Sequence, residues 1–434
     1  MKSHTNLTDL HIDFLNDFSN SILMKSIYFI FITIVLDMLG IGLIIPVLPD
    51  VIRRFSTDPQ AVTELFGYFV AVYAFMQFFA SPILGSLSDR FGRRPILLGS
   101  LLGASIDYVF MAFAPTLSLL FAGRLISGLS GASMTVANSY IADVSDDSNR
   151  AANFGMIGAA FGIGFIAGPL MGGALGHISH QAPFLAAASL NFLNFIFGVF
   201  ILPESLKLEH RRPIQFRKLN PFSSIRKLLS NKSILYFIIT YVLLYLAGNV
   251  HPSIWTLYTE KRFAWTSFEV GVSLSFVGLV YGFSQAVLTK KLVPLWGEVK
   301  ALRVGLFFNA FGFVLYALVP YGWMMYGVML ISCLSALAMP CLQSLMTKQI
   351  AANRQGELQG GLVSLSSLSA IAAPLLYTSS FNWAVAHDRK FSWVAGLPYL
   401  LAAGIVFLCW VLIATKLKKS NESTQNSIIS PLQK

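Results

Sequence analysis

Twelve long apolar segments set the strongest limit on what this 434-residue sequence can fold into. Soluble proteins carry about 25% charged residues, whereas charged residues make up 12% of this chain and hydrophobic residues 55%. That composition cannot cover a water-facing surface, so a soluble enzyme and a disordered scaffold are both disfavoured. Because backbone polar groups in lipid must be satisfied internally, we predict an all-α membrane protein with 12 transmembrane helices. The predicted spans are residues 26–48, 63–86, 95–114, 118–140, 153–175, 183–202, 233–255, 268–289, 300–319, 323–345, 357–379 and 394–415.

The distribution of basic residues predicts the orientation of the chain. An even number of spans places both termini on the same side of the membrane. If that side is the cytoplasm, 24 of the 31 Lys and Arg residues lie on it, six lie on the opposite side, and Arg124 lies within a span. Cytoplasmic loops carry such an excess of Lys and Arg. We therefore expect a multi-pass protein of a bacterial inner (plasma) membrane with both termini cytoplasmic.

One long polar stretch, residues 203–232, divides the spans into two sets of six. It is expected to be a cytoplasmic linker, although a basic helix that binds anionic lipid is an alternative. Before the first span, Asp and apolar residues alternate with a helical period. That amphipathic tail lies on the membrane, docks onto the basic loops, or extends into solvent. The predicted units are a cytoplasmic tail at 1–25, six-helix bundles at 26–202 and 233–415 that flank the linker, and a second cytoplasmic tail at 416–434.

The two predicted halves resemble each other in sequence. The pair Asn-Arg at 149–150 recurs at 353–354, an offset of 204 residues. The run Ile-Ala-Gly-Pro-Leu at 166–170 recurs as Ile-Ala-Ala-Pro-Leu at 371–375, an offset of 205. A duplicated six-helix unit is typical of transporters, in which the substrate binds between the repeats near the membrane midplane. We therefore expect two pseudo-symmetric halves; a channel is the less favoured alternative.

A short loop between the second and third spans carries the most specific motif. The run Gly-Ser-Leu-Ser-Asp-Arg-Phe-Gly-Arg-Arg-Pro at 85–95 resembles the loop signature of the major facilitator superfamily. Gly85 and Gly92 permit close packing and a tight turn. Asp89 can accept bonds from arginines or face a helix N-terminus, and such a cluster can hold a gate closed. The alternative is that the charged residues of this loop only fix the orientation of the chain in the membrane.

Further motifs narrow the resemblance. The glycines at 164, 168, 172 and 173, with Pro169, resemble the pattern of the drug/proton antiporter branch, in which small residues let helices approach closely. Pro169 is expected to kink or loosen its helix. The gating residues are predicted to be Gly85, Asp89, Arg90, Gly92, Arg93, Arg94, Gly168 and Pro169. Over about residues 26–415 the chain looks like the tetracycline efflux transporters, through motifs at 123–124, 142–143, 202–205, 262–265 and 354–360.

Three charged residues lie deep inside predicted spans of the first half, away from the span ends. Each costs about 2.5–3.5 kcal/mol on insertion scales, so Asp37, Asp107 and Arg124 are functional candidates. At 1.5 Å per residue, Asp107 and Arg124 have similar depths on neighbouring antiparallel helices. We expect these two to pair, with Asp37 competing for the same arginine. A purely structural ion pair is the alternative.

The resemblance implies roles for these and other polar residues. Positions matching Asp37, Asp107 and Arg124 carry transport in tetracycline efflux transporters, and Gln77 and Gln285 match polar cavity positions. The substrate and proton set is predicted to be Asp37, Gln77, Asp107, Arg124, Gln285, Asn309 and Tyr281.

The second half departs from the family. The family places a carboxylate and a histidine where this chain has Asn309 and Tyr281. His251 and Glu357 are expected near helix ends, in the interfacial region. On this interpretation the second half has no carboxylate or histidine deep in a helix, so Asp37 or Asp107 must carry any coupled proton.

The predicted function is secondary active export of an amphiphilic, tetracycline-like drug in exchange for protons, by alternating access. The alternative is a carrier for another metabolite, such as a siderophore or an amino-acid derivative, not coupled to protons through the usual second-half residues. No metallohydrolase or serine-hydrolase motif occurs in the sequence, so an enzyme is not expected. We expect no cofactor and no resident metal, although the substrate can arrive as a metal chelate. The expected partners are the drug, protons and membrane lipid, without nucleic acid, and the expected unit is a monomer.

Overall fold

The computed structural model describes residues 27–131, 133–145, 150–211, 213, 220–230, 234–350, 355–387 and 394–429. Within these ranges, twelve helical segments are long and apolar enough to cross a membrane, which confirms the predicted number of spans. The predicted amphipathic tail at 1–25 lies outside the described residues. So do residues 149, 353 and 354 of the Asn-Arg repeat.

The first half contains six spans and one short helix. A six-residue helix, α2 (Leu48–Arg53), follows the first span. The fourth span is built from two helices, because α5 ends just before Gly131. The spans are Ile27–Ile44, α3 (Pro59–Phe91), α4 (Arg93–Phe113), α5 (Leu117–Ser130) with α6 (Ser133–Asp143), α7 (Arg150–Gly176) and α8 (Ala182–Ile201).

The second half is less regular than the first. Between the halves lie η1 (Leu208–His210) and α9 (Pro221–Leu229). Three of the six later spans change helix type or break near their middle. The spans are α10 (Leu235–Gly248) with α11 (Val250–Phe263); α12 (Ser267–Phe283), the π-helix η3 (Ser284–Leu288) and α13 (Thr289–Trp296); α14 (Glu298–Leu318); α15 (Met324–Ile331), the 3-10 helix η4 (Ser332–Leu337) and α16 (Ala338–Thr347); α17 (Gln355–His387); and η6 (Val394–Gly396) with α18 (Leu397–Ile429).

Local sequence signals account for several helix ends. The Asp58 carboxylate accepts a hydrogen bond from the Gln60 amide at 3.1 Å, and Pro59 occupies the first turn of α3. Thr266 and Glu269 form a capping box that starts α12. The last helix continues to Ile429, past the predicted end of the twelfth span at residue 415, so part of the predicted C-terminal tail is helical.

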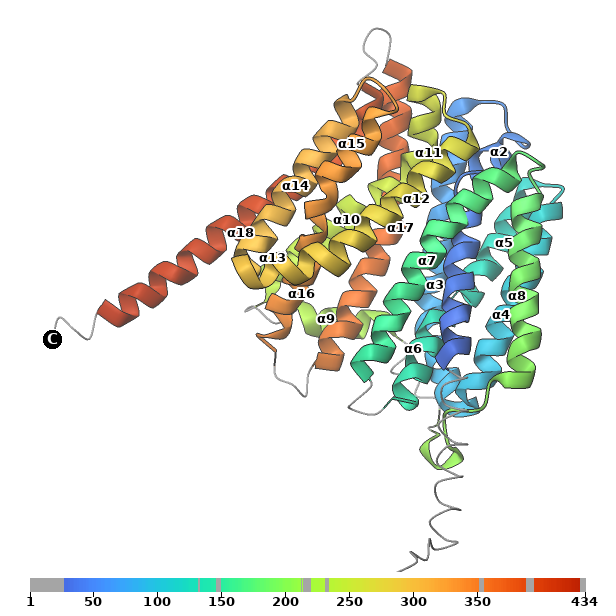
Figure 1. Ribbon diagram of the computed structural model, residues 1–434, viewed down its shortest axis with the longest axis horizontal. Helices are drawn as coiled ribbons and strands as arrows, with labels where there is room; N and C mark the ends of the chain where they lie inside the picture. The colour runs from blue at the N-terminus through green and yellow to red at the C-terminus, as the bar shows by residue number, and fades with distance from the viewer. Residues whose placement is uncertain are drawn as a thin grey trace, which may run out of the picture.

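The two halves meet along four helices. Figure 1 shows the first half, coloured blue to green, beside the second half, coloured yellow to red, with α3 and α7 next to α12 and α17. The helices α7 and α12 pack along each other, as do α3 and α17. One end of the bundle carries α2 and the α11–α12 turn, and the opposite end carries α9. We call these the α2 end and the α9 end.

Candidate transport and gating sites

Asp107 lies where the third and fourth spans touch. Its side chain, on α4, has no exposed surface. A Cβ atom added to Gly123 on α5 would lie 3.1 Å from Asp107 Oδ1, so the glycine leaves room for the carboxylate. This contact agrees with the prediction that Asp107 and Arg124, the residue after Gly123, have similar depths.

The expected direct pair between Asp107 and Arg124 does not form. Among the described residues, no ion pair or hydrogen bond joins Asp107 to Arg124, and Nε of Arg124 has no hydrogen-bond partner. The Asp107 carboxylate instead has the Ser127 side chain, one turn further along α5, beside it. The Arg124 guanidinium carbon lies 4.7 Å from the ring centroid of Phe69 and 4.2 Å from that of Tyr73. A guanidinium stacks readily on aromatic faces. Because α5 directs the arginine toward α3 and not toward α4, its charge acts on Asp107 without a direct contact.

Two tyrosines complete this cluster, and the sequence analysis missed both. The charges of Asp37, Asp107 and Arg124 all act on the phenol groups of Tyr73 and Tyr108. The five residues therefore share one electrostatic environment, which we call the first-half charge cluster. A signal for Tyr73 was available, since it lies four residues before Gln77 on α3 and so shares its helix face.

Two glycines leave the space that the side chains of Tyr73 and Tyr108 occupy. A Cβ atom on Gly40, close to Asp37 in the first span, would lie 2.7 Å from the Tyr108 hydroxyl oxygen. A Cβ atom on Gly131 would lie 2.5 Å from the Tyr73 hydroxyl oxygen. Gly131 follows the end of α5, and its carbonyl accepts a hydrogen bond from Gln77 Nε2 at 3.0 Å. Gln77 thus stabilises the break in the fourth span.

The predicted second-half residues form a separate group. In η3, Gln285 Nε2 donates to the Tyr281 hydroxyl at 3.1 Å and to the Ala336 carbonyl at 3.2 Å. Tyr281 and Asn309 line a cavity of about 210 Å³. The described structure thus brings Gln285, Tyr281 and Asn309 together within the second half.

His251 contradicts the expectation that the second half has no histidine deep in a helix. It lies near the middle of the seventh span, Leu235–Phe263, and lines the same cavity as Asn309. The prediction failed because α10 and α11 form one long span that ends at Phe263, eight residues beyond the predicted end. The apolar run alone did not show that the helix continues through the polar sequence that follows it.

At the α9 end, Arg93 organises the predicted gating loop. Arg93 is buried and forms ion pairs with Asp89 Oδ1 at 2.6 Å and Asp143 Oδ2 at 2.9 Å. Its Nη1 also donates to Ser88 Oγ at 2.7 Å. These contacts tie the α3–α4 loop to the end of α6, all within the first half.

Glu204 covers the N-terminus of α4, a role that the sequence analysis had considered for Asp89. Its carboxylate accepts hydrogen bonds from the Arg93 amide at 2.8 Å and the Arg94 amide at 3.3 Å. An anion at a helix N-terminus is stabilised by free amides and the helix dipole. Gly92 has a φ of 106°, which only glycine adopts easily.

The other residues of the loop contribute differently from the prediction. A Cβ atom on Gly85 would meet only Thr135, at 3.7 Å, so this structure does not need a glycine there. The Arg90 guanidinium lies over the Phe91 ring at 5.2 Å, and Arg94 Nη2 donates to the Val199 carbonyl at 2.7 Å. Of the four predicted charged gating residues, Asp89 and Arg93 form the ion-paired core.

We expect Asp89→Ala to slow turnover several-fold without weakening drug binding. The substitution removes one of two carboxylates from Arg93 while Asp143 still holds it, so the loop persists but loses part of its stabilisation. Transport rate and drug affinity should be measured separately, with Arg90→Ala as the control. An equal loss of affinity would contradict the gating role.

The glycines of α7 pack in two directions. Gly164 and Gly168 lie against the first span, where added Cβ atoms would meet Met38 at 2.7 Å and the Leu39 carbonyl at 2.7 Å. Gly173 lies against α12 of the other half, at 2.6 Å from the Ser267 carbonyl. The helix runs unbroken through Pro169, so the expected loosening does not interrupt it. The small residues therefore serve close packing on both sides of α7.

At the α2 end, polar contacts connect the halves directly. Arg53 Nη1 pairs with Asp50 Oδ1 at 2.6 Å and Arg53 Nη2 with Glu260 Oε2 at 2.5 Å. Ser267 Oγ donates to Asp50 Oδ2 at 3.0 Å. These four residues, which we call the α2 latch, hold α2 of the first half against α11 and α12 of the second. Glu260 and Arg53 were not predicted as site residues, because each reads as an ordinary loop charge.

The fold and these sites define a twelve-helix secondary transporter made of two six-helix halves. The sequence matches the family model of the Major Facilitator Superfamily over residues 30–374. The chain belongs to the Major Facilitator Superfamily and is a tetracycline-efflux-like member of it. It is a multi-pass membrane protein of the inner-membrane type.

The relatives share most of their length with this chain. The chain is 41% identical over 369 residues to the class C tetracycline resistance protein of Escherichia coli. The aligned region covers 85% of this chain and 93% of that protein. The chain is 38% identical to the class B protein of Escherichia coli, with coverage of 84% and 90%. The crystal structure of the human organic anion transporter MFSD10 has the same fold, with a TM-score of 0.68, 24% identity, and coverage of 90% and 99%.

Proposed function

We propose that this chain exports a tetracycline-like drug in exchange for protons, by alternating access between its two halves. The observation that carries the proposal is the match to tetracycline resistance proteins over most of both chains. The charge cluster of the first half supports it. A buried Asp107 and an intramembrane Arg124 are costly in lipid and are typical of transport pathways. The relatives favour a drug over a siderophore or an amino-acid derivative as the substrate.

We also propose how the chain is oriented in the membrane and how many copies work together. The excess of Lys and Arg supports a cytoplasmic α9 end with both termini on that side, so that the α2 latch faces the periplasm. In that orientation the state described here is closed to the periplasm. We propose that the chain works as a monomer of two bundles, 26–202 and 233–415. A metal bound to the drug would be cargo and not a resident cofactor.

Uptake into inverted membrane vesicles tests the proposed function. In such vesicles the periplasmic face is inside, so export appears as accumulation of tetracycline. We expect accumulation when the lumen is acidified, and little when a protonophore removes the gradient. Vesicles without the chain are the control. Accumulation that is independent of the chain or of the gradient would overturn the proposal.

The α2 latch should set how often the periplasmic side opens. We expect Glu260→Gln to raise the rate of labelling of Ser275→Cys from the periplasm by up to about fivefold, because a partly exposed ion pair contributes up to about 1 kcal/mol. Ser275 on α12 donates to the Ile166 carbonyl on α7 at 2.6 Å, where the two halves meet. A cysteine at position 275 therefore becomes accessible when the halves separate on the periplasmic side. Labelling with a membrane-impermeant maleimide measures it. Glu269→Gln, at the same end but outside the latch, is the matched control; unchanged labelling in Glu260→Gln contradicts the latch.

A further inference from the structure

The second half encloses a cavity that the first-half charge cluster does not share. Its volume is about 210 Å³, and its lining comes from four spans: the seventh, eighth, ninth and tenth. The lining includes the polar side chains of Asn309, Ser332 and Ser335, together with His251. No Asp, Glu, Lys or Arg is among the described residues that line it. Among the side chains in this lining, the imidazole of His251 is the one whose ordinary pKa lies near neutrality.

Three interruptions of regular helix converge on this cavity. The seventh span breaks between Gly248 and Val250, three residues or fewer from His251. The tenth span contains the 3-10 helix η4, which contributes Ser332 and Ser335 to the cavity wall. The eighth span contains the π-helix η3, and from it Gln285 donates to the Ala336 carbonyl of η4 at 3.2 Å.

Irregular backbone inside a membrane is tolerated where it lines a cavity or is buried in protein. Mid-helix 3-10 and π-helical turns frequently mark functional hinges. Broken membrane helices also build the substrate and ion sites of transporters. The convergence of three such breaks on one cavity therefore points to a site, and not to packing alone.

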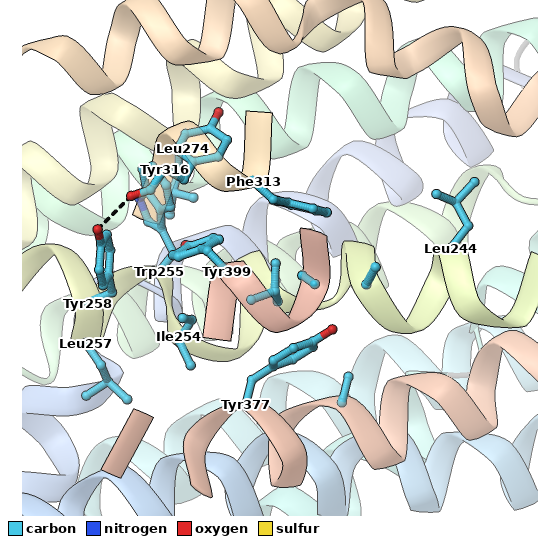
Figure 2. Packing of buried hydrophobic residues seen from close by; sticks show 14 of the residues in the cluster. Leu244, Ile254, Trp255, Leu257, Tyr258, Leu274, Phe313, Tyr316, Tyr377 and Tyr399 are labelled. Atoms are coloured by element: carbon cyan, nitrogen blue, oxygen red, sulfur yellow. Dashed lines mark hydrogen bonds between the residues drawn. The ribbon is translucent and has the colours of Figure 1, made fainter. Parts of the chain in front are cut away.

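Aromatic rings surround His251, and two of them, Phe313 and Tyr316, also line the cavity. The His251 ring centroid lies 5.5 Å from Trp255, 5.5 Å from Phe313, 5.0 Å from Tyr316 and 5.5 Å from Tyr399. Figure 2 shows these four rings gathered around one region of the second half, with Tyr258 donating to the Tyr316 carbonyl. We call the four rings the aromatic cage.

The cage can hold the imidazole ring in both charge states. A neutral imidazole packs among aromatic rings as another flat ring. A protonated imidazole lies within the distance of about 6 Å at which aromatic faces attract cations. The titratable groups facing it are Tyr316 of α14, Tyr399 of α18, and Tyr281 and Cys333 across the cavity.

We propose that His251 is a proton-binding residue of the transport cycle. A proton from the cavity binds an imidazole nitrogen in one state of the transporter, and the same nitrogen releases it in another, so that one proton is carried without any other change. Movement at the three helix breaks changes how closely the rings surround the imidazolium. That change makes His251 alternate between binding and releasing the proton. This inference rests on the proposed proton exchange and assigns part of it to the second half.

Separate measurement of exchange and of uphill transport tests the inference. Drug-for-drug exchange needs no net proton movement, whereas uphill accumulation does. We expect His251→Gln and His251→Phe to retain exchange within about twofold and to lose gradient-driven accumulation at least about tenfold, with a flattened dependence on pH between about 6 and 8. His387→Gln is the matched control, because His387 lies at the end of α17 and stacks on Trp383.

Two outcomes overturn the inference. One is accumulation with an unchanged pH profile in both variants. The other is an equal loss of exchange and accumulation in both, which makes His251 a structural or drug-binding residue.

Titration of histidine NMR signals in labelled wild-type protein separates this inference from the proposed function. The signal that His251→Phe removes should change its chemical shift with pH as the imidazole binds a proton. If the wild-type protein moves no drug, the proposed function fails, and the titration alone still decides whether His251 binds a proton. A signal whose chemical shift does not change with pH counts against the inference.

Discussion

Asp37→Asn is expected to reduce gradient-driven drug accumulation at least about 100-fold. Asp37 lies within the first span, and its charge acts on Tyr73 and Tyr108 together with those of Asp107 and Arg124. Asparagine has nearly the same shape but can neither carry a charge nor bind and release a proton. The helix should insert normally, because the substitution removes a charge from lipid. Accumulation in inverted vesicles, divided by the amount of protein in the membrane, measures the effect.

Two further variants separate the charge from the shape at this position. Asp37→Glu keeps the carboxylate and should recover part of the transport, whereas Asp37→Ala should behave like Asp37→Asn. Asp58→Asn is a control outside the span, where the carboxylate caps α3. Normal accumulation by Asp37→Asn at a normal protein level would remove Asp37 from the transport mechanism.

Arg124→Ala should have the second-largest effect, a loss of about tenfold to 100-fold. The substitution removes the cation that lies over the rings of Phe69 and Tyr73, and it leaves the buried Asp107 without the positive charge that acts on it. Arg124→Lys should not restore transport, because a compact ammonium group cannot stack on two rings as a flat guanidinium does. Transport by each variant, and drug binding measured separately, show which step fails.

A charge-swapped double variant tests the geometry of this cluster. Sequence reasoning alone predicts that Asp107→Arg combined with Arg124→Asp restores a direct pair. The structure predicts no rescue, because the two side chains do not contact each other and the rings that receive the guanidinium lie on α3. Recovery of transport in the double variant would show that the two residues pair directly after all.

The sequence was sufficient to predict the fold because the position of each span depends on one property, the length of an uninterrupted apolar run. An apolar run of about twenty residues has few structures open to it in lipid. Every predicted span therefore has a counterpart, from Ile27–Ile44 to Val394–Thr415. The motif at 85–95 likewise indicated the loop that Arg93 organises. Helix rise alone predicted similar depths for Asp107 and Arg124, and the contact of Gly123 with Asp107 agrees with that prediction.

The sequence was insufficient where side-chain direction or irregular backbone decides the outcome. The face of α5 from which Arg124 projects determines whether it meets Asp107 or Tyr73, and helix depth says nothing about that direction. His251 was misplaced because the seventh span continues through a break at Asn249 into a polar stretch. The pairing of Arg53 with Glu260 depends on contact between the two halves, and these two residues are 207 positions apart in sequence. Such contacts leave no local pattern in a single chain.

Proton movement driven by the drug alone is the sharpest test of whether this chain exchanges drug for protons. The purified chain is reconstituted into vesicles with equal pH on both sides, and an outward gradient of tetracycline is then imposed. We expect drug that leaves the vesicles to drive protons inward and make the lumen more acidic, and we expect Asp37→Asn to abolish this change. Drug efflux through the wild-type chain at an unchanged lumenal pH would contradict exchange of drug for protons.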